Sequence, residues 1–209
     1  MSEVSTEPRP AGRVEEERKR LILDAAAACV VEDGVDLLTL RKVAKRARVS
    51  IGMITYYFAT KNELMIATLR RTEERITAQR RLEVGPNPAI EGVERALEIS
   101  LTQPETANWP FRLAYAAKAA HEPELQTYHA ERIEGLRRGM IHAIERSVES
   151  GKIRRDLDAG ILADMLLCVY QGLGTEVTLD SEHMPPERAV QILEAFLSFW
   201  YTDAGRKPG

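Results

Sequence analysis

The feature that most constrains the fold of this chain is the stretch from residue 38 to residue 64, whose pattern predicts two short helices joined by a tight turn. The apolar residues of the first helix recur at helical spacing, which places them on one narrow face. They are Leu40, Val43, Ala44 and Ala47, and the opposite face carries Arg41, Lys42, Lys45, Arg46 and Arg48. Thr39 precedes this helix and can cap it through its hydroxyl oxygen. We therefore expect a buried apolar face backed by a basic one.

A second helix is expected after the turn, ending near Phe58. Val49 is the apolar residue that would fill the corner, and Ser50 is suited to cap the helix that follows. Ile54 and Phe58 are spaced to face inward together, which leaves the remaining side chains at the surface. These are Ile51, Gly52, Met53, Thr55, Tyr56 and Tyr57.

Thr60 and Glu63 have the spacing of a capping box, which predicts that a third helix starts at this point. It places the Lys61 cation beside the end of the second helix. The pattern continues toward Arg81 without a break, so this helix is expected to join the first part of the chain to the rest. Residues 85–88 combine glycine, proline and asparagine, which predicts a loop.

Two short helices of this kind are typical of a helix-turn-helix, in which the first helix braces the second and the second enters a major groove of DNA. The small residues Ala44 and Gly52 suit helices that cross closely. An ordinary amphipathic helix pair in an all-helical protein has the same periodicity. Periodicity alone therefore leaves both interpretations open.

The residue identities in this stretch resemble the DNA-binding domain of TetR-family transcriptional regulators. The matching residues are Thr39, Arg41, Ala44, Val49, Ser50, Gly52, Ile54, Tyr56, Tyr57, Phe58 and Lys61. Within that family, residues 50–71 (SIGMITYYFATKNELMIATLRR) are most similar to the BetI-type branch, which is associated with control of choline-to-betaine genes. The resemblance implies a dimeric repressor and a small-molecule effector, with choline as that effector. Thr55 departs from the tyrosine that many members carry at this position.

DNA contacts are expected from both helices of the stretch. We predict phosphate contacts from Thr39, Arg41, Tyr56, Tyr57 and Lys61, with a buried Tyr57 as the alternative. The second helix has no Arg, Asn or Gln to read a base through paired hydrogen bonds. Specificity would then rest on Ile51 and Met53 against thymine methyl groups, on the Thr55 hydroxyl, on Arg41 and on DNA shape. Ser50 and Gly52 complete the predicted DNA-binding surface.

The distribution of charge supports this interpretation better than the total does. The whole chain has a formal net charge of −3, which by itself argues against a nucleic-acid protein. Residues 13–82, however, contain 15 Lys and Arg against 10 Asp and Glu, whereas residues 83–209 contain 13 against 20. A basic segment joined to an acidic one suits a protein that docks only one end on phosphates.

The predicted fold class is all-α, with an N-terminal three-helix helix-turn-helix DNA-binding domain and a larger C-terminal helical ligand-binding and dimerisation domain. The expected bounds are a disordered tail at 1–13, the helix-turn-helix domain at 14–60, a linking helix at 61–82, and the effector-binding and dimerisation domain at 83–209. Further helices are expected at 14–32, 89–102, 109–120, 123–150, 159–179 and 186–201.

The last two predicted helices are apolar over more than one face, so part of their surface needs a second partner. A two-fold four-helix interface between two copies would supply it, with Gly172 and Gly174 permitting close approach. The residues predicted for this homodimer interface are Ile161, Met165, Val169, Leu173, Val190, Leu193, Phe196, Leu197 and Trp200. The alternative is that both helices are fully internal. A dimer would present two recognition helices to an inverted repeat in double-stranded DNA.

An effector pocket is expected among the helices of the C-terminal domain. Its candidate lining residues are Trp109, Phe111, Tyr115, His121, Tyr128, Met140, Met165, Tyr170 and Glu176, with His129 and His142 as further polar candidates. Aromatic side chains could cage a quaternary ammonium such as choline. Aromatic and methionine residues at helical spacing are, however, more often ordinary core residues.

Several other functions find no support in the sequence. There is no phosphate-binding glycine loop, no nucleophile elbow and no His-Glu-x-x-His motif, so we predict no enzymatic activity, no cofactor and no metal site. Cys29 and Cys168 lie in apolar helical patterns, and no apolar run is long enough to span a membrane, which favours a reduced, cytoplasmic protein. The alternative function is an all-helical ligand-binding or interaction protein without DNA binding.

Overall fold

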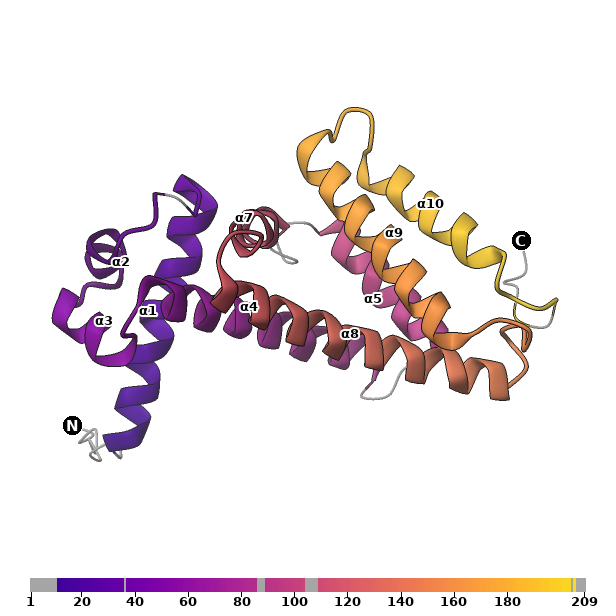
Figure 1. Ribbon diagram of the computed structural model, residues 1–209, viewed down its shortest axis with the longest axis horizontal. Coiled ribbons are helices and arrows are strands. Elements are labelled where there is room, and N and C mark those ends of the chain that lie inside the picture. Colours follow the sequence, from indigo (N-terminus) through magenta and orange to yellow (C-terminus); the bar gives the residue numbers. More distant parts are fainter. Residues whose placement is uncertain (1–10, 36, 86–88, 104–108, 204, 206–209) are drawn as a thin grey trace, which may run out of the picture. The chain divides into compact units, whose positions relative to one another are not determined.

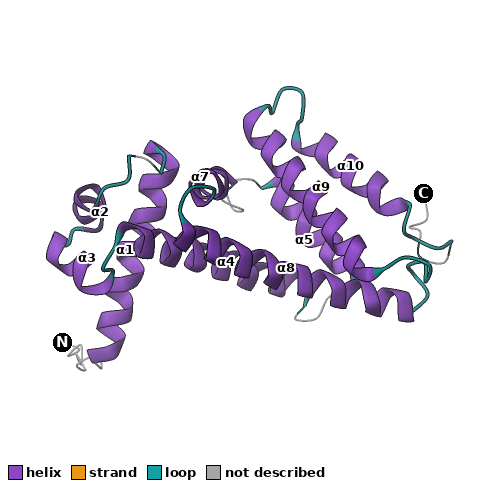
Figure 2. Cartoon of the chain, viewed as in Figure 1, coloured by secondary structure: helices purple, strands orange, loops and turns teal. Residues whose placement is uncertain are grey.

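The computed structural model describes residues 11–35, 37–85, 89–103, 109–203 and 205. Within these residues the chain forms helices and no strand, which confirms the predicted all-α class (Figures 1 and 2). Residues 1–10 of the predicted tail lie outside the described part. Residues 11–13 are not part of a tail, because the first helix begins at Ala11. None of the described helices combines the length and apolar character needed to cross a bilayer.

The chain divides into two compact units, unit 1 (Met1–Arg71) and unit 2 (Thr72–Gly209). Unit 1 contains α1 (Ala11–Asp33), α2 (Leu40–Ala47), α3 (Ile51–Tyr57) and the first part of α4 (Lys61–Val84). Unit 2 contains the rest of α4, then α5 (Ile90–Thr102), α7 (Trp109–Ala119), α8 (Pro123–Glu149), α9 (Ala159–Leu179) and α10 (Pro186–Ser198). The boundary between the units therefore falls inside one continuous helix.

The core of unit 1 is built from one apolar face of each helix. Ile22 of α1, Val43 of α2 and Ile54 of α3 are fully buried, as are Leu64 and Met65 at the start of α4. On α1 the buried residues recur at helical spacing, so this helix turns one stripe inward; they are Ile22, Ala25, Ala26, Cys29 and Val30. The result is a small core in which α2 packs on α1 and α3 packs on α2.

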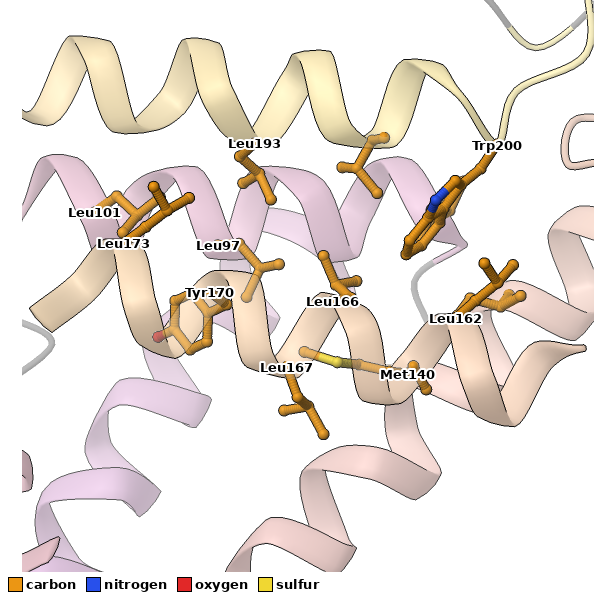
Figure 3. Packing of buried hydrophobic residues seen from close by; sticks show 14 of the residues in the cluster. Leu97, Leu101, Met140, Leu162, Leu166, Leu167, Tyr170, Leu173, Leu193 and Trp200 are labelled. Carbon is orange, nitrogen blue, oxygen red and sulfur yellow. The ribbon is translucent and has the colours of Figure 1, made fainter. Parts of the chain in front are cut away.

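The core of unit 2 lies among α5, α8, α9 and α10 (Figure 3). Leu97 of α5, Met140 of α8, Leu166 of α9 and Leu193 of α10 are buried and belong to one hydrophobic cluster. At roughly 25 cal/mol per Å² of apolar surface removed from water, a cluster of this kind stabilises the fold more than any polar contact in the unit. The helices of unit 2 are thus packed on one another without a metal or disulfide among the described residues.

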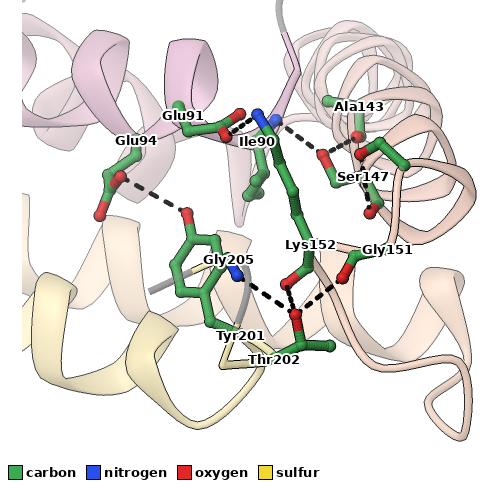
Figure 4. Close-up of polar contacts among 11 residues, drawn as sticks. Ile90, Glu91, Glu94, Ala143, Ser147, Gly151, Lys152, Tyr201, Thr202 and Gly205 are labelled. Carbon is green, nitrogen blue, oxygen red and sulfur yellow. Dashed lines mark hydrogen bonds and ion pairs between the residues drawn. The ribbon is translucent and has the colours of Figure 1, made fainter. Parts of the chain in front are cut away.

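The end of α10 differs from the prediction. The helix ends at Ser198, before the expected end at residue 201, and the chain then pairs with the segment that follows α8. Tyr201 forms an isolated antiparallel bridge with Ile153, and the Thr202 hydroxyl donates to the Gly151 carbonyl over 2.7 Å (Figure 4). Because Trp200 is 3% exposed, burial of its indole favours this extended path over one more helical turn.

Polar contacts hold the start of α5 to α8. The backbone N–H of Ile90 donates to the Ser147 hydroxyl over 3.0 Å, and that hydroxyl donates to the Ala143 carbonyl over 2.9 Å (Figure 4). The first bond satisfies an N–H that has no partner within α5. An ion pair between Lys152 and Glu91 lies next to it. A buried serine thus serves as a connector rather than as a reactive group.

Candidate functional site

The turn between α2 and α3 is built from caps that the sequence encodes. Thr39 accepts a hydrogen bond from the Lys42 backbone N–H over 3.2 Å, and Ser50 accepts one from the Met53 N–H over 3.1 Å. Between them Arg48 adopts a left-handed conformation with φ of 55°, which ends α2 and turns the chain. Each cap satisfies a backbone donor at a helix start, so the two short helices are held at a defined angle.

Helix α3 turns one side inward and leaves the other side free. Ile54 and Phe58 are 0% and 2% exposed, which agrees with their predicted inward orientation. Tyr56 is 75% exposed and Ile51 is 46% exposed. Ser50, Gly52 and Thr55 are also exposed, as are Thr39 and Arg41 beside α2. Most residues predicted to contact DNA therefore lie on open surface of unit 1.

Three of the predicted DNA-binding residues are only half-exposed. They are Met53, Tyr57 and Lys61. Tyr57 is therefore neither fully exposed, as a phosphate contact would be, nor buried, as the alternative required. Its ring meets that of Tyr56 edge-on with 5.0 Å between centroids, and its centroid lies 6.3 Å from that of Phe58. Burial raises the pKa of the Tyr57 phenol, and the nearby Glu15 carboxylate adds to this shift. Its hydroxyl therefore stays protonated and can donate to a phosphate oxygen.

Ion pairs with α1 hold part of the basic face of α2. Lys42 pairs with Asp33 over 3.0 Å, and Arg46 forms a two-point pair with Glu32, with Nη2 2.6 Å from Oε1. These pairs use cations that the charge pattern alone would assign to DNA. By contrast, none of Arg41, Lys45 and Arg48 is paired with a carboxylate in the part of the chain that the structure describes. These three cations are exposed on the surface of unit 1.

A groove beside the turn adds residues that the sequence did not indicate. It is lined by Arg18 and Asp24 of α1 together with Arg48, Ser50 and Met53. Asp24 is itself paired with Arg71 over 2.8 Å, so the groove keeps an excess of positive charge. Arg18 is exposed and lies far from the turn in the sequence. It precedes the buried Ile22 and Ala25 by four and seven residues, so helical spacing places it on the same side of α1, but no local pattern links it to α3.

The predicted effector residues separate into an interior group and an exposed group. Trp109, Phe111, Tyr115, Met140 and Tyr170 are buried, and Tyr128 is half-buried. The rings of Trp109 and Tyr170 meet at 5.1 Å, and those of Tyr115 and Tyr128 meet at 6.1 Å. His121, Met165 and Glu176 are exposed, so the structure does not bring them to the interior. Met140 belongs to the hydrophobic cluster with Leu166 and Leu167 (Figure 3).

The interior of unit 2 also contains a group of polar and charged residues that we call the arginine cluster; sequence reasoning missed Glu73, Arg112 and Arg132 but named His129 and Tyr170 as pocket candidates. It consists of Glu73 on α4, Arg112 on α7, His129 and Arg132 on α8, and Tyr170 on α9. Arg132 donates to Glu73 over 2.9 Å, and Arg112 Nε lies 3.9 Å from the same carboxylate oxygen. Arg112 donates to the Tyr170 hydroxyl over 3.1 Å. A signal was present, because Arg112 interrupts the apolar run 109–117 of α7.

The residues predicted for the dimer interface also divide into two groups. Ile161 and Met165 of α9 are 62% and 43% exposed, and Val169, Val190 and Phe196 are half-buried. Leu173, Leu193, Leu197 and Trp200 lie instead in the hydrophobic core of their own chain, so they have no surface left for a partner. Gly174 is buried as well, and the group close to it is the indole of Trp109, not a second backbone.

Comparison with known proteins gives the family. Residues 22–68 match the model of bacterial regulatory proteins of the tetR family, and residues 89–198 match the C-terminal domain of BetI-type transcriptional repressors. The second match alone covers more than half of the chain. The two matches lie largely within unit 1 and unit 2 respectively.

Individual relatives agree with both matches. The chain is 31% identical over 186 residues to the HTH-type transcriptional regulator BetI of Escherichia coli, covering 87% of this chain and 92% of BetI. It is 28% identical over 178 residues to an HTH-type transcriptional repressor of Mycobacterium tuberculosis, covering 85% and 89%. In fold, it matches a transcriptional regulator of Saccharomonospora viridis solved in complex with choline, with a TM-score of 0.79, 21% identity and coverage of 89% and 98%. The chain therefore belongs to the TetR family of bacterial transcriptional regulators, with a C-terminal domain of the BetI type.

Proposed function

We propose that this protein is a dimeric transcriptional repressor that binds an inverted repeat in double-stranded DNA and is released by a small-molecule effector. The observation that carries the proposal is the exposed side of α3, which is capped by Ser50 and presents Ile51, Thr55 and Tyr56. A helix held this way can enter a major groove with its N-terminal end leading. Such a regulator acts where chromosomal DNA is, so we also propose a cytoplasmic location. We further propose that the protein has no enzymatic activity.

The proposed contacts follow from exposure and charge. Thr39, Arg41, Tyr56, Tyr57 and Lys61 would bind phosphates and set the register of the protein on DNA. Ile51, Gly52, Met53 and Thr55 would face base edges, with Ser50 at the N-terminus of the helix. The exposed cations Lys45 and Arg48 would add attraction that does not depend on sequence.

An exposed apolar stripe on α9 and α10 supports the proposed dimer. On α9, Ile161, Met165, Cys168, Gly172 and Leu179 are exposed at spacings that share one side of the helix. Ile192 of α10 is 36% exposed, and Phe199, directly after the end of this helix, is 75% exposed. A second copy related by a two-fold axis would cover these side chains in a four-helix interface. Two α3 helices would then meet successive major grooves, about 34 Å apart.

Coupling between effector and DNA is proposed to run through α4. This helix is continuous from Lys61 to Val84, so it carries residues of both units. In unit 1 it supplies the buried Leu64 and Met65, and in unit 2 it supplies Glu73 to the arginine cluster. An effector that changes how α4 is held in unit 2 would favour a state with lower DNA affinity.

The test is selection of bound fragments from sheared genomic DNA by the purified protein, followed by affinity measurements at several salt concentrations. We expect fragments that share an inverted repeat, two copies of the chain per repeat, and an affinity that falls steeply with salt. Absence of binding to any fragment, or binding that does not depend on salt, would favour an all-helical ligand-binding or interaction protein instead. Fragments without a repeat would contradict the dimer.

A further inference from the structure

The arginine cluster carries more positive than negative charge. Arg112 and Arg132 have side chains that are 11% and 8% exposed, and both remain cationic at any physiological pH. The carboxylate they share is Glu73, which is 2.9 Å from Arg132 and 3.9 Å from Arg112. Tyr170 adds a neutral phenol as the hydrogen-bond partner of Arg112. One carboxylate for two buried guanidinium groups leaves an excess positive charge within the arginine cluster.

Two polar atoms of the cluster indicate the chemistry of a ligand. Arg132 Nε and His129 Nδ1 are buried and have no hydrogen-bond partner among the described residues. Buried polar atoms in proteins are nearly always hydrogen-bonded, so each such atom calls for a partner of matching chemistry. Arg132 Nε is a donor only, and a ring nitrogen of neutral histidine can be a donor too. Both atoms can therefore be satisfied by an acceptor such as a carboxylate oxygen.

The same geometry opposes a quaternary ammonium ligand. The aromatic faces that would cage such a cation already hold the guanidinium of Arg112, whose Cζ lies 4.6 Å from the ring centroid of Trp109 and 5.7 Å from that of Tyr170. A second cation would also meet Arg132. Like charges at short range in a medium of low dielectric constant repel strongly. The choline expected from the BetI resemblance therefore does not fit these residues.

We propose that the effector of this protein is a small carboxylate with an apolar or aromatic body, bound by Arg112, Arg132 and His129. This inference rests on the proposed function, because it names the chemical class of the effector in that proposal. The apolar body is assigned from the rings beside the cluster, since Tyr115 stacks at 6.5 Å on His129 and meets Tyr128 at 6.1 Å. Arginine binds a carboxylate through two parallel hydrogen bonds, which also orients the ligand.

A carboxylate ligand would compete with Glu73 for the two arginines. Glu73 lies on α4, close to the boundary at which this helix passes from unit 1 to unit 2. When the ligand takes over Arg132, the bond that ties α4 to α8 is weakened. The carboxylate would thus act on the helix through which the effector is proposed to control DNA binding.

The test is calorimetric titration of the purified full-length protein with phenylacetate, phenylacetamide and choline. Phenylacetamide has nearly the same shape as phenylacetate but no charge, and choline carries the opposite charge. We expect phenylacetate to bind at least tenfold more tightly than either of the other two. Equal affinity for phenylacetate and phenylacetamide, tighter binding of choline, or no measurable binding of phenylacetate would overturn the proposal.

Matched variants on α8 locate the site. Arg132→Gln is expected to lower phenylacetate affinity at least tenfold, whereas Arg137→Gln should leave it unchanged, because Arg137 pairs with the exposed Asp164 over 2.6 Å. Glu73→Gln removes the competing carboxylate and should raise the affinity several-fold. Equal effects of Arg132→Gln and Arg137→Gln, or weaker binding by Glu73→Gln, would contradict the assignment. If Arg132→Gln does not fold, the three-ligand comparison with the unmodified protein still decides the question.

DNA binding measured on the same preparation separates this inference from the proposed function. A protein that prefers phenylacetate but binds no genomic fragment would refute the regulator and retain the carboxylate site. A protein that binds its repeat in a salt-dependent way but does not prefer phenylacetate would refute only the effector class. Release of the repeat by phenylacetate, and not by phenylacetamide, is expected if both are correct.

Discussion

Gly174 of α9 faces the indole of Trp109 of α7 so closely that a Cβ atom at residue 174 would lie 2.0 Å from Cζ2 of the tryptophan. The indole is held in place on other sides as well, because its Nε1 donates to the Ser100 carbonyl over 3.1 Å and its ring meets that of Tyr170 at 5.1 Å. A tryptophan held on three sides cannot move aside without loss of these contacts. Gly174 therefore positions Trp109, and through it the ring on which Arg112 rests.

Gly174→Ala is expected to destabilise the protein by about 1–3 kcal/mol, because the added methyl group overpacks the site against Trp109. Gly139→Ala on α8 is the control, since nothing lies within 4 Å of a Cβ atom there. That change should be neutral or stabilise by up to about 1 kcal/mol, as expected for alanine in place of glycine within a helix. Urea unfolding of both variants checks this. Equal stability of the two variants would show that the Trp109 side chain can shift to make room for the added methyl group.

Ser50→Ala should lower the free energy of unfolding by about 1 kcal/mol, because the Met53 N–H loses the side chain that caps α3. Ser50→Asp retains a capping oxygen and should keep normal stability, yet its negative charge would face phosphates. We therefore expect Ser50→Asp to bind DNA more weakly than Ser50→Ala. Thermal unfolding and fluorescence anisotropy with a bound genomic fragment measure the two effects. Normal DNA affinity of Ser50→Asp would remove Ser50 from the interface.

Tyr56→Ala and Lys61→Ala should weaken binding to all DNA sequences alike, since phosphate contacts carry no base information. For Lys61→Ala the dependence of affinity on salt should also fall by about one charge. Met53→Ala should instead change the preference between related sites, because its apolar side chain is proposed to meet thymine methyl groups. Affinities measured over a library of single-base variants check both. A loss confined to a few sites for Lys61→Ala would show that this assignment is wrong.

Met165→Glu should dissociate the proposed dimer, because it puts a charge into the exposed apolar stripe of α9, where Met165 is 43% exposed. Leu37→Glu serves as the control, since Leu37 is 58% exposed but lies in unit 1. Sedimentation velocity should give a monomer for the first variant and a dimer for the second. DNA affinity should fall only for Met165→Glu. A dimeric Met165→Glu would place the interface elsewhere.

Acid should destabilise the protein through His129. Burial lowers the pKa of His129 below its ordinary value of 6.5, and the cations Arg132 and Arg112 lower it further. Above pH 6.5 the histidine is neutral in both folded and unfolded chains, so its contribution to stability is complete. As the pH falls below 6.5, the unfolded chain takes up the proton first, and stability is lost until the folded pKa is reached.

His129→Asn should remove part of this loss between pH 7 and pH 5, whereas His142→Asn, at an exposed position of the same helix, should not. Unfolding in urea at a series of pH values measures the difference. Identical pH profiles for His129→Asn and the unmodified protein would show that His129 takes up its proton normally in the folded state.

Local features of the fold were predictable from the sequence because they depend on neighbours along the chain. The caps at Thr39 and Ser50 act over three residues, and both form as expected. The helix predicted at 159–179 has the bounds that the structure gives it. Ile54 and Phe58 point inward because helical periodicity fixes which residues share a face.

Periodicity could not tell which apolar face of α9 and α10 would be covered by the chain itself. Leu193 and Leu197 were assigned to a partner and proved to be core residues, whereas Phe199, which was not selected, is 75% exposed. A helix that is apolar on several sides offers several stripes to its neighbours. The choice among them depends on helices that are distant in sequence, such as α5.

By itself, the sequence determined the helices, the two-helix stretch with its exposed tyrosine, and the family, since all of these follow from side chains within a few positions of one another. Only the tertiary structure decided that Arg112, Arg132 and Glu73 meet, because the two arginines lie on different helices and Glu73 is 59 residues from Arg132. It also decided that the guanidinium of Arg112 lies over the aromatic faces of Trp109 and Tyr170. Charges interact through space, so the sign of a buried site becomes known only when helices far apart in the chain are packed together.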